Sequence, residues 1–262
     1  MKRAIAVFGL SSLLAMSAHA DLDVRASISG LSFELIDLDP SDGISPSITF
    51  GQGWGNGSTY LYTGAMTEAR SISFSGAFPE TSRSLTTGPA SSEIKFEGID
   101  VGTFATRASI HSSLGVVAPG DRPQEFSGTE WHLGIELSPR TELRVSAIGK
   151  VEANSDLAIA AGTFSDTSAF AKLSLYANSQ FPQDQIAYSY VAPGDLVKFS
   201  ETRDKTLSVS LSNGSSSSET MDLQLQTWIN HSITPIPEPS TSGLVACGLL
   251  LLGGWTRARR VG

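Results

Sequence analysis

Strict alternation of apolar and polar residues is the feature that most limits what this chain can fold into. At 93–97, for example, Ile94 and Phe96 alternate with charged residues. A period of two is that of a β-strand with one buried and one solvated face. No window in the body of the chain, residues 21–233, repeats apolar residues at helical spacing. Further alternating runs occupy 24–29, 31–35, 71–75, 132–137, 141–146, 169–176, 206–211 and 221–228.

Turn-forming residues separate these runs, which favours antiparallel pairing. Two facing sheets can bury the apolar sides of both, so the sequence predicts an all-β fold: an antiparallel β-sandwich of roughly eight to twelve strands with jelly-roll or Greek-key-like connections. A closed barrel is the alternative. Asn213-Gly214 predicts a hairpin, and the stretches 51–57 and 76–92 are expected to be loops.

The N-terminus has the features of a secretory signal peptide. Lys2 and Arg3 precede an apolar stretch at 4–15, and Ala18 and Ala20 form a small-x-small cleavage site. Such segments are removed during export. We therefore expect a signal peptide at 1–20 and a mature chain that begins at Asp21.

The C-terminus has the features of a short membrane span. Residues 239–256 are uncharged and would extend about 27 Å as a helix, close to the ~30 Å hydrocarbon core. Arg257, Arg259 and Arg260 follow as a basic stop that stays on the cytoplasmic side. The sequence predicts transient insertion of this tail into the inner membrane. A buried C-terminal helix of a soluble domain is the alternative.

Pro237, Glu238 and Pro239, followed by the apolar run and the Arg cluster, resemble the PEP-CTERM sorting signal. Ile236 stands where Val is more usual in that signal. The resemblance covers residues 234–262 and leaves 21–233 as the β-sandwich domain. It implies a Gram-negative bacterium, processing by an exosortase, and release to the cell surface or extracellular matrix alongside exopolysaccharide. It implies nothing about the activity of the body.

The charge and the cysteine count exclude several classes of function. Residues 21–234 hold 13 Lys and Arg against 25 Asp and Glu, a net charge of −12. So acidic a body repels phosphate backbones, which disfavours nucleic-acid binding. The single cysteine, Cys247, lies in the tail, so the body has neither disulfides nor thiolate chemistry.

Asp37, Asp39 and Asp42 form an acidic cluster that could bind calcium. They lie within a turn that also holds Pro40 and Gly43, and carboxylate oxygens are ligands that Ca²⁺ prefers. The spacing departs from a calcium loop by one position. The alternative is a turn stabilised by Asp side chains that bond to the nearby backbone.

Aromatic residues and paired carboxylates are the remaining candidates. An exposed Trp54, with Tyr60 and Tyr62, could stack on a sugar; the alternative is that Trp54 packs over the end of the sandwich. Trp131 and Trp228 are expected in the core. Glu130 and Glu136 could form a glycosidase pair, although carboxylates that face outward on strands are mostly solvated surface.

The sequence therefore favours a non-catalytic, exported surface or extracellular-matrix protein, sorted by an exosortase and associated with exopolysaccharide or biofilm. A carbohydrate- or calcium-dependent binding module of the same fold is the second interpretation, and a glycoside hydrolase is the third.

Overall fold

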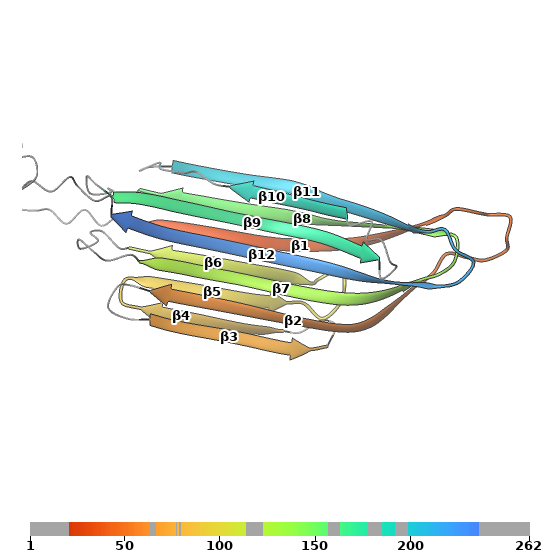
Figure 1. The fold of residues 1–262 in the computed structure, drawn as a ribbon, viewed down its shortest axis with the longest axis horizontal. Helices are drawn as coiled ribbons and strands as arrows, with labels where there is room; N and C mark the ends of the chain where they lie inside the picture. The colour runs from red at the N-terminus through yellow and green to blue at the C-terminus, as the bar shows by residue number, and fades with distance from the viewer. Residues whose placement is uncertain are drawn as a thin grey trace, which may run out of the picture.

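The computed structural model describes residues 21–62, 67–76, 78, 80–113, 123–156, 163–177, 185–191 and 199–235. Within these ranges twelve strands form two antiparallel sheets that pack face to face as a β-sandwich (Figure 1). The predicted all-β sandwich is confirmed, and the closed barrel is not formed. The signal peptide at 1–20 and most of the predicted tail, residues 236–262, lie outside the described residues.

Each sheet has six strands. Sheet A has the order β11 (Phe199–Asn213), β8 (Thr141–Ser155), β1 (Leu22–Asp37), β6 (Ala105–Ser112), β5 (Ala90–Glu97) and β4 (Thr81–Thr87). Sheet B has the order β10 (Gln185–Val191), β9 (Thr163–Ala177), β12 (Glu219–Pro235), β7 (Gln124–Leu137), β2 (Ile48–Tyr62) and β3 (Thr67–Ser75). Strands β4, β5 and β6 form a meander with β1 beside β6, a Greek-key-like arrangement.

The core lies between the sheets and is built from the inward positions of the alternating runs. Trp131 is fully buried at its centre, as predicted, with the Phe104 ring centroid 4.4 Å from its own. Phe74 and Phe96 meet edge to face at 4.8 Å. Burying each such large side chain contributes about 1.5–3 kcal/mol to stability, so the alternation itself accounts for the two-layer fold.

The glycine-rich stretch 51–57 is part of strand β2 and not the predicted loop. Its residues Gly55 and Gly57 face the core, where side chains of β3 and β5 fill the space. A Cβ atom on Gly55 would lie 2.4 Å from the Phe74 ring, and one on Gly57 would lie 2.8 Å from Ile94 Cδ1. Glycine is thus required by close packing, which a reading of turn chemistry misses.

Asn213-Gly214 does not form the predicted hairpin. It joins β11 of sheet A to β12 of sheet B. The buried Asn213 amide nitrogen donates to the carbonyl oxygens of Leu137, Ser138 and Ser217 at 3.2, 3.1 and 2.8 Å. These bonds hold the crossing between the sheets, and a hairpin ladder is not needed.

The predicted loop at 76–92 contains strand β4 and the first residues of β5. Strand β4 consists mostly of Ser and Thr, and its buried, inward-facing residues are Leu85 and Thr87. Hydroxyl residues do not produce an apolar period, but Thr fits a pleated edge strand well.

Candidate functional site

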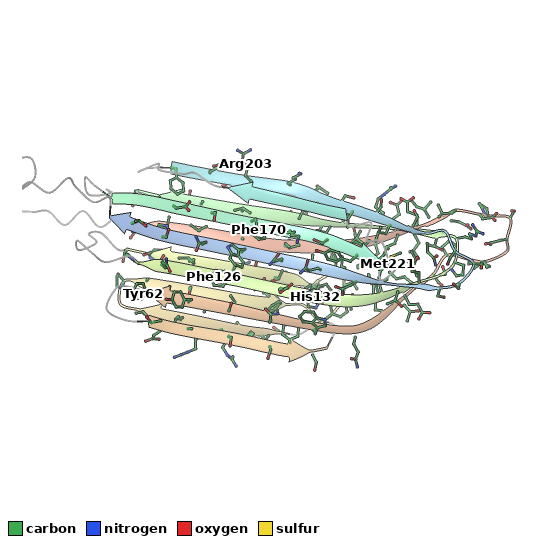
Figure 2. The ribbon with its side chains drawn as sticks, viewed as in Figure 1. Tyr62, Phe126, His132, Phe170, Arg203 and Met221 are labelled. Atoms are coloured by element: carbon green, nitrogen blue, oxygen red, sulfur yellow. The ribbon has the colours of Figure 1, made fainter. Side chains whose placement is uncertain are left out.

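The two outer faces of the sandwich differ in chemistry. On sheet A, the outward positions of β1, β5 and β6 are polar, and they line a hollow of about 340 Å³ with Arg25, Glu93 and Ser109 among its residues. The outward positions of sheet B carry rings instead, four of which are labelled in the side-chain view (Figure 2). These aromatic and imidazole side chains are Trp54, Tyr60, Tyr62, Phe126, His132, Phe170, Tyr176 and Trp228.

Trp54 lies on the face of sheet B, halfway along β2. It is 47% exposed and stacks on the imidazole of His132, with ring centroids 3.8 Å apart and planes 8° apart. Neither predicted setting, an exposed loop or the end of the sandwich, describes this position. His132 covers one face of the indole, and nearly half of the Trp54 surface is still exposed. Tyr60 and Tyr62 follow on the same face of the same strand.

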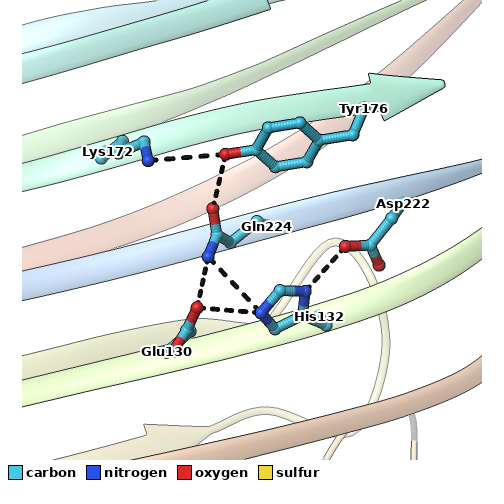
Figure 3. A network of polar contacts seen from close by, with 6 residues as sticks. All are labelled: Glu130, His132, Lys172, Tyr176, Asp222 and Gln224. Carbon is cyan, nitrogen blue, oxygen red and sulfur yellow. Dashed lines mark hydrogen bonds and ion pairs between the residues drawn. The ribbon is translucent and has the colours of Figure 1, made fainter. Parts of the chain in front are cut away.

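His132 is held between two carboxylates from different strands (Figure 3). Its Nδ1 lies 2.7 Å from Asp222 Oδ2 of β12, and its Nε2 lies 3.0 Å from Glu130 Oε1 of its own strand β7. The Gln224 amide donates to the same Glu130 oxygen, and the Tyr176 hydroxyl donates to Gln224 Oε1 at 2.9 Å. This network fixes the ring on which Trp54 stacks.

The charges of this network support one another. Burial disfavours a charged imidazole, but the hydrogen bonds and charges of Asp222 and Glu130 together raise the pKa of His132 above its ordinary value. Burial likewise opposes ionisation of Glu130, but bonds from His132, Gln224 and Asn56 hold the pKa of its carboxyl below the usual range. Below this raised pKa the ring is an imidazolium between two carboxylates, and both of its nitrogens then donate.

A second group of rings surrounds Trp228. This residue is 37% exposed, so the prediction that it is a core residue is wrong. Phe126 meets it edge to face at 4.4 Å, and the Phe170 ring lies parallel to it at 6.2 Å. Gly128 leaves room for this group, because a Cβ atom there would lie 2.9 Å from the Phe126 ring.

A shallow depression of about 70 Å³ adjoins Trp228 on the same face. Its polar side chains come from three neighbouring strands: Asn56 from β2, Glu130 from β7 and Gln226 from β12. Glu130 also belongs to the His132 network, so the depression connects the two ring groups. Amide and carboxylate groups beside exposed rings can bind hydroxyl-rich ligands.

Asp37, Asp39 and Asp42 do not converge on a common point. Asp37 accepts from the backbone of Asp39 at 2.9 Å, and Asp42 accepts from the backbone of Ile44 at 2.7 Å. The side chain and the backbone of Ser41 bond to Asp39 and lower the pKa of its carboxyl. This is the geometry of the alternative, turns stabilised by Asp side chains. Nowhere in the described ranges do three or more His, Cys, Asp or Glu side chains gather closely enough to hold a metal ion.

Glu130 and Glu136 cannot form a glycosidase pair in this fold. They lie six residues apart on one face of β7, which separates them by roughly 20 Å at ~3.4 Å per residue. Glycosidase carboxyl groups lie about 5–10 Å apart.

Two buried ionisable side chains lie opposite each other inside sheet B. Glu125 of β7 and His231 of β12 are cross-strand partners, and both are almost completely buried. His231 Nδ1 is 2.9 Å from the Thr167 hydroxyl, but the Glu125 oxygens and His231 Nε2 make no hydrogen bond of normal geometry to the described residues. Burial raises the pKa of Glu125 to about 7, against the opposing effect of the Ser112 hydroxyl, and lowers the pKa of His231 to about 4.

The predicted sorting residues Pro237, Glu238, Pro239, Arg257, Arg259 and Arg260, and the cleavage residues Ala18 and Ala20, lie outside the described residues. No α-helix capable of crossing a bilayer occurs in the part of the chain that the structure describes.

Comparison with models of known protein families finds no match to this chain, and no curated protein matches it.

Proposed function

We propose that this protein is an exported, non-catalytic β-sandwich that binds polysaccharide on the outer face of sheet B. The observation that carries the proposal is the Trp54 indole, about half exposed and stacked in parallel on the His132 ring. A flat aromatic surface stacks well on the apolar face of a sugar ring. The neighbouring carboxamides and carboxylate are hydrogen-bond partners for its hydroxyl groups.

The two ends of the chain support export to a compartment where polysaccharide is present. The signal peptide leads the chain out of the cytoplasm. The tail, which resembles a PEP-CTERM signal, is recognised by an exosortase and removed. The body then acts at the cell surface or in the extracellular matrix, associated with exopolysaccharide.

The state of the acidic groups supports a binding role over hydrolysis. Glu130 and Asp222, the two carboxylates beside the stacked rings of Trp54 and His132, both bind His132. A general acid needs a raised pKa and a free proton, whereas the pKa of Glu130 is lowered.

Affinity electrophoresis of the body through gels that contain a soluble polysaccharide tests the proposal. Three polymers cover the charge classes: hydroxyethyl cellulose (uncharged), chitosan (cationic) and alginate (anionic). We expect retardation in at least one gel, and we expect Trp54→Ala to abolish it. Ile148→Ala is the matched control, because Ile148 is 46% exposed on the outer face of sheet A. Unretarded migration in all three gels would contradict the proposal. An equal loss of retardation in the Trp54→Ala and Ile148→Ala variants would contradict it as well.

A further inference from the structure

We propose that the site takes an internal stretch of an uncharged polysaccharide, which lies obliquely across β2, β7 and β12 and contacts two ring platforms at once. This inference rests on the proposed function and adds the ligand class and its direction. The Trp54 platform consists of Trp54 and His132. The Trp228 platform consists of Phe126, Trp228 and Phe170.

The strand register gives the distance between the platforms. Trp54 pairs with His132 across β2 and β7, and His132 pairs with Gln224 across β7 and β12. Trp228 lies four residues beyond Gln224 on β12. At ~3.4 Å per residue and ~4.8 Å per strand, the Cα atoms of the two tryptophans are roughly 17 Å apart. One sugar ring cannot reach both platforms, whereas a short run of linked sugars can.

A row of polar side chains crosses the sheet midway between the platforms. Asn56 pairs with Glu130, and Glu130 pairs with Gln226. Gln226 is two residues from Gln224 and two from Trp228, so the row is level with neither tryptophan. All three side chains line the 70 Å³ depression. A sugar held between the platforms therefore meets amide donors and carboxylate or carbonyl acceptors.

The charges near the row favour a ligand without charge. Lys172 of β9 pairs with Gln226 and extends the row. With His132 protonated, His132 and Lys172 balance the carboxylates of Glu130 and Asp222. The strongly acidic body then repels a polyanion. The depression is shallow, so nothing in its geometry selects the end of a chain over its middle.

Oligosaccharides of two and six units, cut from the polymer that is retained, test the two-platform geometry by isothermal titration calorimetry. Each platform alone binds weakly, and linking the two contacts adds affinity. We therefore expect the six-unit ligand to bind at least about ten-fold more tightly than the two-unit ligand. Trp228→Ala and Trp54→Ala should each reduce the six-unit affinity to near the two-unit level, and Ile148→Ala should not.

Equal affinity for the two ligand lengths, an unaffected Trp228→Ala variant, or preferential retention of alginate or chitosan by the native protein would overturn the inference while leaving polysaccharide binding intact. No retention of any of the three polymers would contradict the proposed function itself, and this inference with it.

Discussion

The His132 imidazole lies between two carboxylates and beneath an indole, so its protonation and the position of Trp54 are linked. Its folded pKa is raised, so the stabilisation it provides is present below the unfolded value of about 6.5 and is lost as pH rises through the folded pKa. A protonated imidazole quenches a stacked indole. We therefore expect tryptophan emission to rise in one step centred above the ordinary histidine pKa of about 6.5.

The control for this emission change is Trp54→Phe, which should remove the step. Asp222→Asn should move it to lower pH, because one of the two carboxylates that favour the charged ring is gone. Emission that stays constant as pH rises above 6.5 would contradict the titration of an imidazolium stacked on Trp54.

Glu125 and His231 are expected to make opposite contributions to the pH dependence of stability. Glu125 keeps its proton up to about pH 7 when folded but releases it near 4.5 when unfolded, so stability falls as pH rises through that window. His231 accepts a proton at about pH 4 when folded but near 6.5 when unfolded, so stability falls as pH drops through that window. Where the two windows overlap, the opposite effects of Glu125 and His231 on the pH dependence of stability cancel.

Replacing either group should reveal the slope of the other. We expect Glu125→Gln to add about 3 kcal/mol to the free energy of unfolding at pH 8 and little at pH 4.5. His231→Gln should add a similar amount at pH 4 and little at pH 8. Urea denaturation across this range measures both. A constant difference from the native protein at every pH would show that neither group has a shifted pKa.

At the scale of strands, the glycines of β2 are a packing requirement. A Cβ atom on Gly55 would lie 2.8 Å from the Glu130 carbonyl oxygen as well as against Phe74, and backbone atoms cannot move aside cheaply. We expect Gly55→Ala to destabilise the fold by about 1–3 kcal/mol, measured by urea denaturation.

Gly214→Ala is the matched control, since a Cβ atom there meets nothing within 4 Å. Its effect should stay within about 0.5 kcal/mol. Equal stability of the two variants would mean that the core beside β2 is less tightly packed than these distances indicate.

The strands could be predicted wherever apolar residues alternate, and each predicted run lies within an observed strand. Two stretches predicted as loops are strands in which inward positions are not apolar: β2 has glycines there, and β4 has a threonine. Trp228 was predictable, because Met221, Leu223 and Leu225 take the inward positions of its run and leave it facing outward. The crossing between the sheets at Asn213 could not be predicted, because the Asn213 side chain bonds to residues about 75 positions away in the sequence.

The candidate site emerges only at the scale of the whole molecule. Trp54, His132 and Gln224 come from segments far apart in the chain, and the register of β2, β7 and β12 brings them together. The sequence identified Trp54 as a candidate but gave no sign of the histidine beneath it. The outward residues of an alternating run can be identified from the sequence as candidate site residues. Their neighbours across the sheet depend on the order of the strands, which local sequence patterns do not contain.

Export and processing are predictions that concern the whole chain. We expect mass spectrometry of the secreted protein to show a chain that begins at Asp21 and lacks Leu249–Leu252. Glu238→Ala alters the sorting motif and leaves the body unchanged, so it should leave the tail uncut. A secreted native protein that still carries Leu249–Leu252 would contradict processing.

Chemical-shift mapping by NMR, with the isolated body and an oligosaccharide of the retained polymer, tests polysaccharide binding on sheet B most directly. We expect the shifted amides to cluster around Trp54, Glu130 and Gln226 on β2, β7 and β12, while the amides around the hollow on sheet A stay unchanged. Shifts confined to sheet A, or to the turn at Asp37–Asp42, would contradict it.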